Sequence, residues 1–349
     1  MQESLSVVLA GPQDLQVRRV PVPRVPGPAV RVRMKACGIC GSDLRYLAGE
    51  NPWSLHTLGR HVPCPPGVIL GHEVAGIVLE NGRERRVGIL AFKGCGQCLY
   101  CRTGRENLCA EVQHIGHASG WPEMPHYPGG MAEEFEVWKD FDYDLPDSIS
   151  FEEAIFLDGL AVAVHAAGEA RLEPGKRAGV IGLGPIGMLF AQLAAHRGAE
   201  QVTGWDTAPL PVRLARESVR GQFFRIDPGT YPDRIRGDGL DAVIDTVGDE
   251  RSIRFGLAAL RRGGALVLLA VHEGQVPLAT VGLSGERRVS TSANNCYRDF
   301  VEAIRLMAAG AIRVQQLITH HFPLAEARQA FEVMCRKEEN QAYKIILTP

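Results

Sequence analysis

A glycine-rich hexapeptide, GLGPIG (182–187), follows the apolar run RAGVI (177–181) and opens the helical pattern PIGMLFAQLAAHRGA. This order of a short apolar run, glycines and apolar residues at helical spacing predicts a strand, a tight turn and a helix. The alternation continues downstream, with strands predicted over 200–206, 239–248 and 263–271 and helices over 210–219 and 251–262. Alternating strands and helices form a parallel sheet covered on both faces, so this region is predicted to be a doubly wound α/β domain of the Rossmann type.

The three glycines of the hexapeptide suit a nucleotide-binding turn. Gly182 allows the turn itself, Gly184 lets the backbone approach a pyrophosphate, and Gly187 lets the helix pack closely on the strand. Asp206 ends the next strand at the distance where an acid accepts hydrogen bonds from the adenosine ribose and repels a 2′-phosphate. We therefore expect NAD as the cofactor, although Arg213 leaves NADP open. The other cofactor-binding residues predicted here are Pro185, Ile186 and Val247.

Four of the nine cysteines lie in one stretch, CGQCLYCRTGRENLC, at positions 95, 98, 101 and 109. Four thiolates make a closed tetrahedral shell, which is typical of a structural zinc ion. The stretch therefore predicts a zinc lobe held by Cys95, Cys98, Cys101 and Cys109. An iron–sulfur cluster and four unrelated buried cysteines are the alternatives.

The sequence before residue 150 has a different character. Residues 5–36 alternate apolar and polar positions with interspersed prolines, which predicts strands with irregular joins, and residues 37–130 are rich in Gly, Pro, Cys and His. After about residue 290, helices are predicted over 298–310 and 325–337 and a last strand over 342–349. A chain of 349 residues favours two domains. We expect one of 1–150 with 292–349, and a nucleotide-binding domain of 151–291.

Charge and hydropathy exclude several functions. The formal net charge is −2 and no basic stripe with interleaved aromatic residues is present, so a nucleic-acid surface is not expected. No apolar run reaches the ~20 residues that cross a bilayer, and the N-terminal residues do not resemble a secretion signal. The sequence therefore predicts a cytoplasmic protein without a nucleic-acid or membrane partner.

Two short motifs, CGICGSD (37–43) and LGHE (70–73), precede the zinc lobe. Together with the lobe, the nucleotide turn and the ending ITHHFPLAEARQAFEVM, they resemble the zinc-dependent medium-chain dehydrogenase/reductase family, in particular its sorbitol-dehydrogenase-like members. The resemblance covers essentially the whole chain. It implies a β-rich, GroES-like catalytic domain with a structural zinc lobe, a Rossmann domain, and assembly as a homodimer or homotetramer.

The resemblance also implies roles for individual residues. Cys40 matches the thiolate ligand of a catalytic zinc ion, and His72 matches its imidazole ligand. Asp43 matches the acid that orients this imidazole. Glu73 matches a glutamate that can approach the metal or replace a ligand, and Ser42 matches the hydroxyl that contacts the substrate oxygen and starts a proton relay.

A third ligand is implied in the stretch AIFLDGLAVAVHA (154–166). Local propensity alone predicts a turn at Asp158-Gly159. Polyol-type relatives, however, carry a glutamate ligand where this chain has Asp158. Aspartate is one methylene shorter, so Asp158 either binds zinc directly, at ~2.2 Å, or reaches it through a water molecule beyond roughly 3.5 Å.

This chain departs from the family pattern at two points. Arg45 stands where relatives often have a histidine near the end of the relay, and arginine keeps its proton. The relay is therefore expected to end in water or at His56. Asn294 and Asn295 stand near the place of an Arg-Tyr pair that many sugar-alcohol dehydrogenases carry.

We therefore expect a zinc- and NAD-dependent dehydrogenase of a secondary alcohol, with a polyol, sugar or cyclitol-like substrate. The alternatives are a threonine-type amino-alcohol dehydrogenase or a simple alcohol dehydrogenase. A third hypothesis is a non-catalytic nucleotide-binding protein that keeps only the structural zinc ion.

Overall fold

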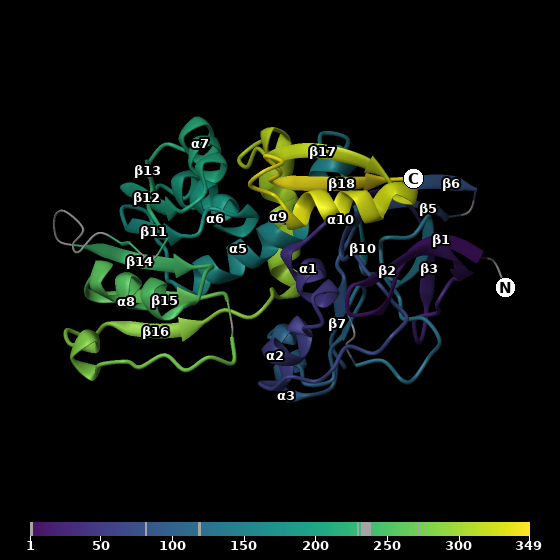
Figure 1. Ribbon diagram of the computed structural model, residues 1–349, viewed down its shortest axis with the longest axis horizontal. Helices are drawn as coiled ribbons and strands as arrows, with labels where there is room; N and C mark the ends of the chain where they lie inside the picture. The colour runs from purple at the N-terminus through teal and green to yellow at the C-terminus, as the bar shows by residue number, and fades with distance from the viewer. Residues whose placement is uncertain (1–2, 81, 118–119, 229, 232–238, 271) are drawn as a thin grey trace. The chain divides into compact units, whose positions relative to one another are not determined.

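The computed structural model describes residues 3–80, 82–117, 120–228, 230–231, 239–270 and 272–349 (Figure 1). The chain divides into two compact units. Unit 1 comprises Met1–Asp158, Cys296–Ile304 and Val314–Pro349, and unit 2 comprises Gly159–Asn295 and Arg305–Arg313. Unit 1 is therefore assembled from segments that lie on both sides of unit 2 in the sequence.

Unit 1 is built mainly from strands. Its largest sheet has the order β10-β6-β5-β3-β18-β17, with β9 also paired to β3. These strands are β10 (Asp142–Asp144), β6 (Arg83–Ile89), β5 (Glu73–Glu80), β3 (Ala29–Gly38), β18 (Lys344–Thr348), β17 (Ile318–Pro323) and β9 (Glu134–Trp138). A second sheet has the order β2-β1-β4, with β1 (Glu3–Gly11), β2 (Asp14–Pro21) and β4 (Val68–Ile69). A short pair, β7 (Phe92–Lys93) and β8 (Gln113–His114), flanks the cysteine stretch.

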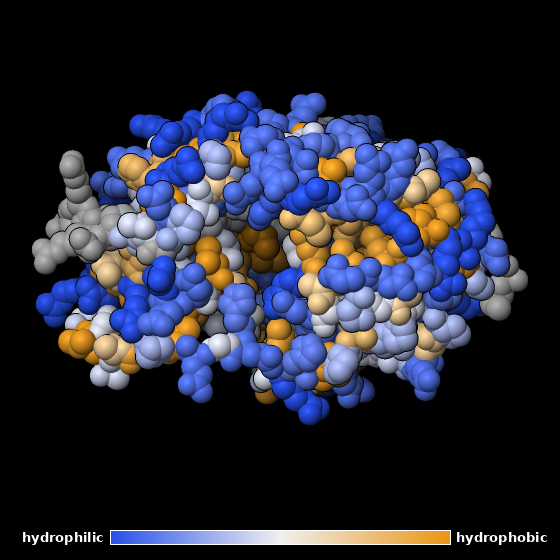
Figure 2. Space-filling view, in the orientation of Figure 1, coloured by the Kyte–Doolittle hydropathy of each residue, from blue (hydrophilic) through white to orange (hydrophobic). Residues whose placement is uncertain are grey.

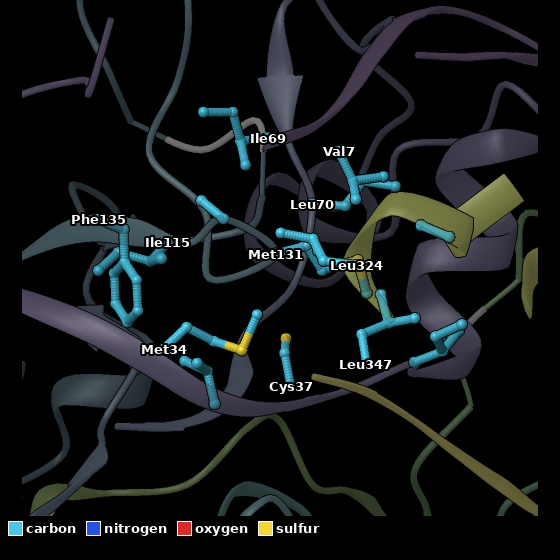
Figure 3. Close-up of a cluster of buried hydrophobic side chains, with 14 of the residues drawn as sticks. Val7, Met34, Cys37, Ile69, Leu70, Ile115, Met131, Phe135, Leu324 and Leu347 are labelled. Atoms are coloured by element: carbon cyan, nitrogen blue, oxygen red, sulfur yellow. The ribbon is translucent and has the colours of Figure 1, made fainter. Parts of the chain in front are cut away.

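The pairing of β3 with β18 brings the C-terminal segment into the middle of the large sheet. Ile346 pairs with Gly38 and Leu347 with Cys37, in antiparallel register. The predicted alternation of apolar and polar residues is confirmed in β3, where Val32, Met34 and Ala36 are fully buried. In β1 it is wrong, because the consecutive residues 6–9 are all buried. Figure 3 shows part of the resulting core, in which side chains from β1, β3, β18 and several loops converge around Cys37.

Unit 1 also contains several short helices. They are α1 (Gly41–Leu47), α2 (Pro52–Leu58), α3 (Leu99–Arg102), α4 (Phe151–Ala154) and α10 (Ala327–Cys335), with 3-10 turns at η1 (Glu106–Leu108), η3 (Gln315–Leu317) and η4 (Leu324–Glu326). Two helices have residues in both units, α5 (Leu157–Glu169) and α9 (Tyr297–Ala308). The turn that propensity predicts at Asp158-Gly159 is wrong, because both residues lie in the first turn of α5. Buried Leu157 and Leu160 stabilise this helix through packing, which overrides the local preference.

Unit 2 confirms the predicted parallel sheet. Its strand order is β13-β12-β11-β14-β15-β16, and every pairing is parallel. The elements are β11 (Arg177–Ile181), α6 (Pro185–His196), β12 (Gln201–Asp206), α7 (Pro209–Ser218), β13 (Gln222–Arg225), β14 (Leu240–Asp245), α8 (Glu250–Ala259), β15 (Leu260–Leu268), η2 (Thr280–Leu283) and β16 (Arg288–Thr291). The chain runs outward from β11 to β13 and then returns to β14 on the other side of β11. A ligand crevice forms at such a reversal, at the carboxyl ends of the strands.

The boundary between α8 and β15 differs from the prediction. The helix expected over 251–262 ends at Ala259, and Leu260 begins β15. Arg261, expected on the helix, instead pairs with Asp241 at the start of the neighbouring strand, with Nη2 and Oδ1 2.6 Å apart. This ion pair near the starts of β14 and β15 therefore favours the extended conformation at Arg261.

Among the residues that the structure describes, none of the helices is long and apolar enough to span a bilayer. The face shown in Figure 2 is mainly hydrophilic, with apolar side chains scattered over it in small groups. Such scattered groups are normal on a protein surface.

The contact between β11 and α6 depends on Gly187. A Cβ atom on Gly187 would lie 2.0 Å from the carbonyl oxygen of Gly182, which is a backbone atom and cannot swing aside. A Cβ atom on Gly184, in the same turn, would meet no atom within 4 Å, and its φ of −63° suits any residue. The two glycines therefore differ in their packing requirement.

We expect Gly187→Ala to destabilise unit 2 by about 1–3 kcal/mol, because helix and strand must separate to admit the methyl group. For a domain of this size that is roughly 2–4 °C of thermal midpoint per kcal/mol. The matched control Gly184→Ala should leave the midpoint nearly unchanged. Differential scanning calorimetry of the two variants checks this, and equal midpoints would contradict the packing role of Gly187.

Candidate metal centres and nucleotide site

Cys40 and His72 are held on two loops of unit 1 by one carboxylate. Cys40 immediately precedes α1, and Asp43 in the first turn of this helix accepts a hydrogen bond from the Cys40 N–H at 2.8 Å. The other oxygen of Asp43 accepts from the N–H of Gly71 at 3.4 Å. Asp43 is fully buried. It therefore ties the loop that carries the thiol to the loop that carries the imidazole.

The turn before His72 requires glycine. Gly71 has a φ of +92°, and a Cβ atom there would lie 2.5 Å from Met131 Cγ and 2.8 Å from Cys37 Sγ. This turn directs His72 Nδ1 toward Asp43 Oδ1, 3.9 Å away, and His72 Nε2 toward Ser42 Oγ, 3.5 Å away. An imidazole with one nitrogen facing a carboxylate and the other facing a thiol-bearing loop has the orientation of a metal ligand.

Three potential ligand atoms, from Cys40, His72 and Glu73, lie within 4.8 Å of one another. Glu73 also forms a buried ion pair with Lys344, whose Nζ donates to the carbonyl of Ile39 at 3.2 Å. The side chains of Lys344 and Glu73 are 1% and 7% exposed. Glu73 thus already has a cationic partner within the protein.

Asp158 lies in the same buried region, on the first turn of α5. Its Oδ1 is buried and has no hydrogen-bond partner among the described residues. Burial raises the pKa of Asp158 to about 6; His72 and Lys344 act to lower it, and Glu73 adds to the rise. Asp158 is therefore a carboxylate without a local partner for one of its oxygens.

The charges of these groups do not balance. Burial alone would lower the pKa of His72, yet Cys40, Asp43 and Asp158 raise it to about 10. Burial also raises the pKa of Asp43. Three carboxyl groups and a thiol thus face one lysine and one imidazole in a buried volume, a donor set that fits a divalent cation. Thiolate, imidazole and carboxylate are ligands that zinc accepts.

The four cysteines of the predicted lobe come together. Their Sγ atoms lie within 4.8 Å of one another. The N–H groups of Cys98, Cys101 and Cys95 donate to Cys95, Cys98 and Cys109 Sγ respectively, each at 3.4 Å. The backbone N–H groups of Gln97 and Cys98 lower the pKa of Cys95 to about 7, which favours a thiolate. The cluster therefore fits a tetrahedral zinc ion with four sulfur ligands.

The glycine-rich turn of unit 2 has the form expected of a nucleotide site. Gly182 has a φ of +85°, and a Cβ atom there would clash with Thr246 Oγ1 at 2.2 Å and approach Val247 Cγ2 at 3.1 Å. Gly184 is the N-cap of α6, which begins with Pro185, Ile186 and Gly187. The N-terminus of this helix presents backbone N–H groups that suit a phosphate.

Asp206 is fixed at the end of β12. Its Oδ2 accepts from the N–H of Leu183 at 2.7 Å, and its Oδ1 accepts from the N–H of Ala208 at 2.8 Å. Each carboxylate oxygen has a second lone pair free to accept from a ribose hydroxyl. Arg213 is exposed on α7. Arg225, which pairs with Asp206 in the sheet register, donates to Thr207 O at 3.2 Å.

The remaining predicted residues have the following places. Arg45 forms an ion pair with Glu50, with Nε and Oε2 2.6 Å apart, and His56 lies on α2. Asn295 is fully buried, and its neighbour Asn294 has a φ of +51°. The roles given to these side chains and to the ligand candidates above remain predictions.

Sequence reasoning missed three residues near these sites. Lys344 was overlooked because a lysine in the predicted strand AYKIILTP is normally on the solvent face. His114 and His117 lie beside His72, with ring centroids 5.7 Å and 4.6 Å away. The repeated histidines in HIGH (114–117) were a possible signal, because such polar residues rarely sit together in a core.

Comparison with known proteins agrees with this architecture. The pattern of the alcohol dehydrogenase GroES-like domain matches residues 26–147, and that of the zinc-binding dehydrogenase matches residues 185–309. Sorbitol dehydrogenase of Bacillus subtilis is 27% identical, over 100% of this chain and 98% of its own length. The Aspergillus clavatus protein named probable D-xylulose reductase A is 30% identical, over 95% of this chain and 93% of its own.

Solved structures show the same fold. L-idonate 5-dehydrogenase of Escherichia coli superimposes with a TM-score of 0.86 at 25% identity, covering 100% of this chain and 99% of the other. A Sinorhizobium meliloti protein crystallised with NADP superimposes with a TM-score of 0.85 at 28% identity, covering all of both chains. The predicted fold class and family are thereby confirmed. The chain belongs to the zinc-dependent medium-chain dehydrogenase/reductase family, of the polyol dehydrogenase type.

Proposed function

We propose that this protein is a zinc- and NAD-dependent dehydrogenase that oxidises a secondary hydroxyl group of a polyol, sugar or cyclitol-like substrate. The charge-unbalanced donor set of Cys40, His72 and Glu73, with the Asp158 carboxyl group acting on the same imidazole, carries this proposal. In a protein that bound only a structural zinc ion, a second group of acidic side chains would cost free energy to bury without a compensating cation. The names of the relatives, which include sorbitol dehydrogenase and L-idonate 5-dehydrogenase, support the substrate class.

Cys40, His72 and Asp158 are the residues proposed to hold the catalytic zinc ion. Glu73 contributes less as a ligand, because its carboxylate is neutralised by Lys344. Asp158 Oδ1 and His72 Nδ1 both lack a hydrogen-bond partner among the described residues, and a metal ion supplies one to the carboxylate. Cys95, Cys98, Cys101 and Cys109 hold the structural zinc ion.

When bound, zinc lowers the pKa of the substrate hydroxyl, and the nicotinamide accepts the hydride. Ser42 takes part in proton removal, because its hydroxyl lies 3.5 Å from His72 Nε2 and its side chain is partly exposed. Asp43 keeps His72 in one orientation. Lys344 keeps Glu73 from competing with the substrate as an additional anionic ligand.

For the cofactor, Asp206 supports NAD, because a carboxylate at this place repels a 2′-phosphate. Its two backbone hydrogen bonds keep it at the glycine-rich turn. The Arg225 side chain on the neighbouring strand is the feature that would favour NADP, as Arg213 was in the sequence. Both cofactors are therefore included in the test.

The proposed function is tested with the purified protein, NAD or NADP, and a panel of sugar alcohols, cyclitols, threonine and simple secondary alcohols. We expect reduction of NAD with at least one polyol and little or none with threonine. Zinc content is measured on the same sample by atomic absorption. Turnover of simple alcohols alone would contradict the polyol assignment, and NADH binding without any turnover would support the non-catalytic alternative.

We expect Cys40→Ser to lower turnover by roughly a thousandfold or more, because loss of the thiolate weakens the metal site and its Lewis acidity. The variant should contain one zinc ion per chain fewer than the parent, with an unchanged far-ultraviolet circular dichroism spectrum. Cys335→Ser, at an exposed cysteine, is the control and should change neither quantity. Full activity of Cys40→Ser would exclude a catalytic zinc ion at this site.

We expect Cys98→Ala to affect stability first, because the lobe orders around its metal ion and a three-thiolate site binds more weakly. The variant should lose zinc to a chelator faster than the parent and unfold at lower temperature. A chelator titration followed by a colorimetric zinc indicator measures this. An unchanged rate of zinc release would show that Cys98 is not a ligand.

We expect Asp206→Asn to raise the KM for NAD by about tenfold and to lower the KM for NADP. The change removes the charge that binds ribose hydroxyls and repels the phosphate, and charge-assisted hydrogen bonds contribute about 1.5–3 kcal/mol. Asp249→Asn, at the N-cap of α8, is a control for loss of an acid that caps backbone N–H groups. Equal effects on the two cofactors would contradict the assignment.

A further inference from the structure

Three histidine rings of unit 1 form one packed cluster. His117 stacks on His114, with ring centroids 4.0 Å apart and an angle of 13° between the planes. His117 also meets His72 edge to face, at 4.6 Å and 85°. On another side, His117 contacts the ring of Tyr46 at 5.3 Å. His117 is thus in direct contact with the imidazole proposed to bind the catalytic zinc ion.

The hydrogen-bonding nitrogens of this cluster are not equally satisfied. His114 Nδ1 lies 2.8 Å from the carbonyl of Ile115, which only accepts, so this nitrogen donates. Tyr46 Oη donates to Asn51 Oδ1 at 3.1 Å. His117 Nε2 and His72 Nδ1, in contrast, are buried and have no hydrogen-bond partner among the described residues. His72 Nδ1 still faces the Asp43 carboxylate, 3.9 Å away. A buried polar atom without a partner costs about 1–3 kcal/mol.

Packing alone does not account for a histidine here. A phenylalanine ring would stack on His114 and meet His72 and Tyr46 in the same way without leaving a buried nitrogen unpaired. The orphaned nitrogen therefore points to a ligand that supplies the missing partner when it binds. Its place against His72 makes the substrate that ligand, because the proposed reaction occurs at the group that His72 holds.

We propose that His117 Nε2 forms a hydrogen bond with a second hydroxyl group of the substrate, on a carbon next to the one that is oxidised. This inference rests on the proposed function and names a specificity residue for it. A neutral imidazole nitrogen either donates or accepts, depending on its tautomer, and a hydroxyl group matches both. The site thereby selects polyols over alcohols with a single hydroxyl group, because a substrate without the second hydroxyl leaves His117 unpaired.

The test compares two pairs of small substrates in the holoenzyme. Propylene glycol and isopropanol both carry a secondary hydroxyl group on a three-carbon chain and differ only in the neighbouring hydroxyl. Hydroxyacetone and acetone form the corresponding pair for the reverse reaction. The ratio of kcat/KM within each pair measures how much the second hydroxyl contributes.

We expect His117→Phe to lower this ratio by about tenfold, the value of one neutral hydrogen bond, through loss of the diol rate with the isopropanol rate retained. His117→Asn, which keeps a polar atom, should recover part of the ratio. His126→Phe, in the same segment but facing Gly67 and Arg18, is the matched control and should leave it unchanged. An equal loss for both members of a pair would overturn the proposal and assign His117 to packing.

A second measurement does not depend on activity. His117→Phe should keep the zinc content of the parent and unfold at the same or a higher temperature, because it removes a buried unpaired nitrogen. Saturating propylene glycol with NADH should raise the unfolding temperature of the parent more than that of His117→Phe. Equal rises would overturn the proposal. A parent that oxidises none of the panel alcohols would instead refute the proposed function itself.

Discussion

The structure of unit 1 depends on an excess of buried negative charge. Asp43 and Asp158 carry carboxyl groups close to the imidazole of His72, and Glu73 follows it in the chain. Lys344 is the lysine that the structure places against these acids. An isolated buried charge costs several kcal/mol unless it is paired and hydrogen-bonded. Two backbone N–H groups satisfy Asp43, and Lys344 neutralises Glu73. The Cys40 thiol and the Asp158 carboxyl group remain, and both are ligand types that a zinc ion accepts.

Much of the surrounding backbone serves this arrangement. Gly38 ends β3 at the ion pair, where a Cβ atom would lie 2.6 Å from Glu73 Oε2 and 2.9 Å from Lys344 Cε. Gly71 shapes the turn before His72, and Asp158 is the second residue of α5. These positions come from segments far apart in the sequence. The four-cysteine lobe is the opposite case, because its ligands lie within one short stretch and are supported by their own neighbours' N–H groups.

This contrast explains what could be predicted from the sequence. The parallel sheet of unit 2 and the cysteine lobe each produce a local sequence pattern, and both could be predicted from residue spacing alone. The grouping of Cys40, His72 and Asp158 was reached only through resemblance, because no local pattern joins them. The burial of Lys344 could not be predicted, because it follows from the pairing of β18 with β3. That contact joins distant segments and leaves no pattern in the sequence of β18 itself. Local propensity alone puts Asp158 in a turn, whereas tertiary packing puts it in a helix.

The pairing of Lys344 with Ile39, 305 positions apart, has a consequence for biosynthesis. During translation, Cys40, Asp43, Glu73 and Asp158 leave the ribosome before unit 2, and Lys344 follows unit 2. The nascent acids therefore lack their lysine while the whole nucleotide-binding unit is made. Until that last strand inserts, the Glu73 carboxylate lacks its buried cation, so burying this loop is unfavourable before synthesis of the chain ends.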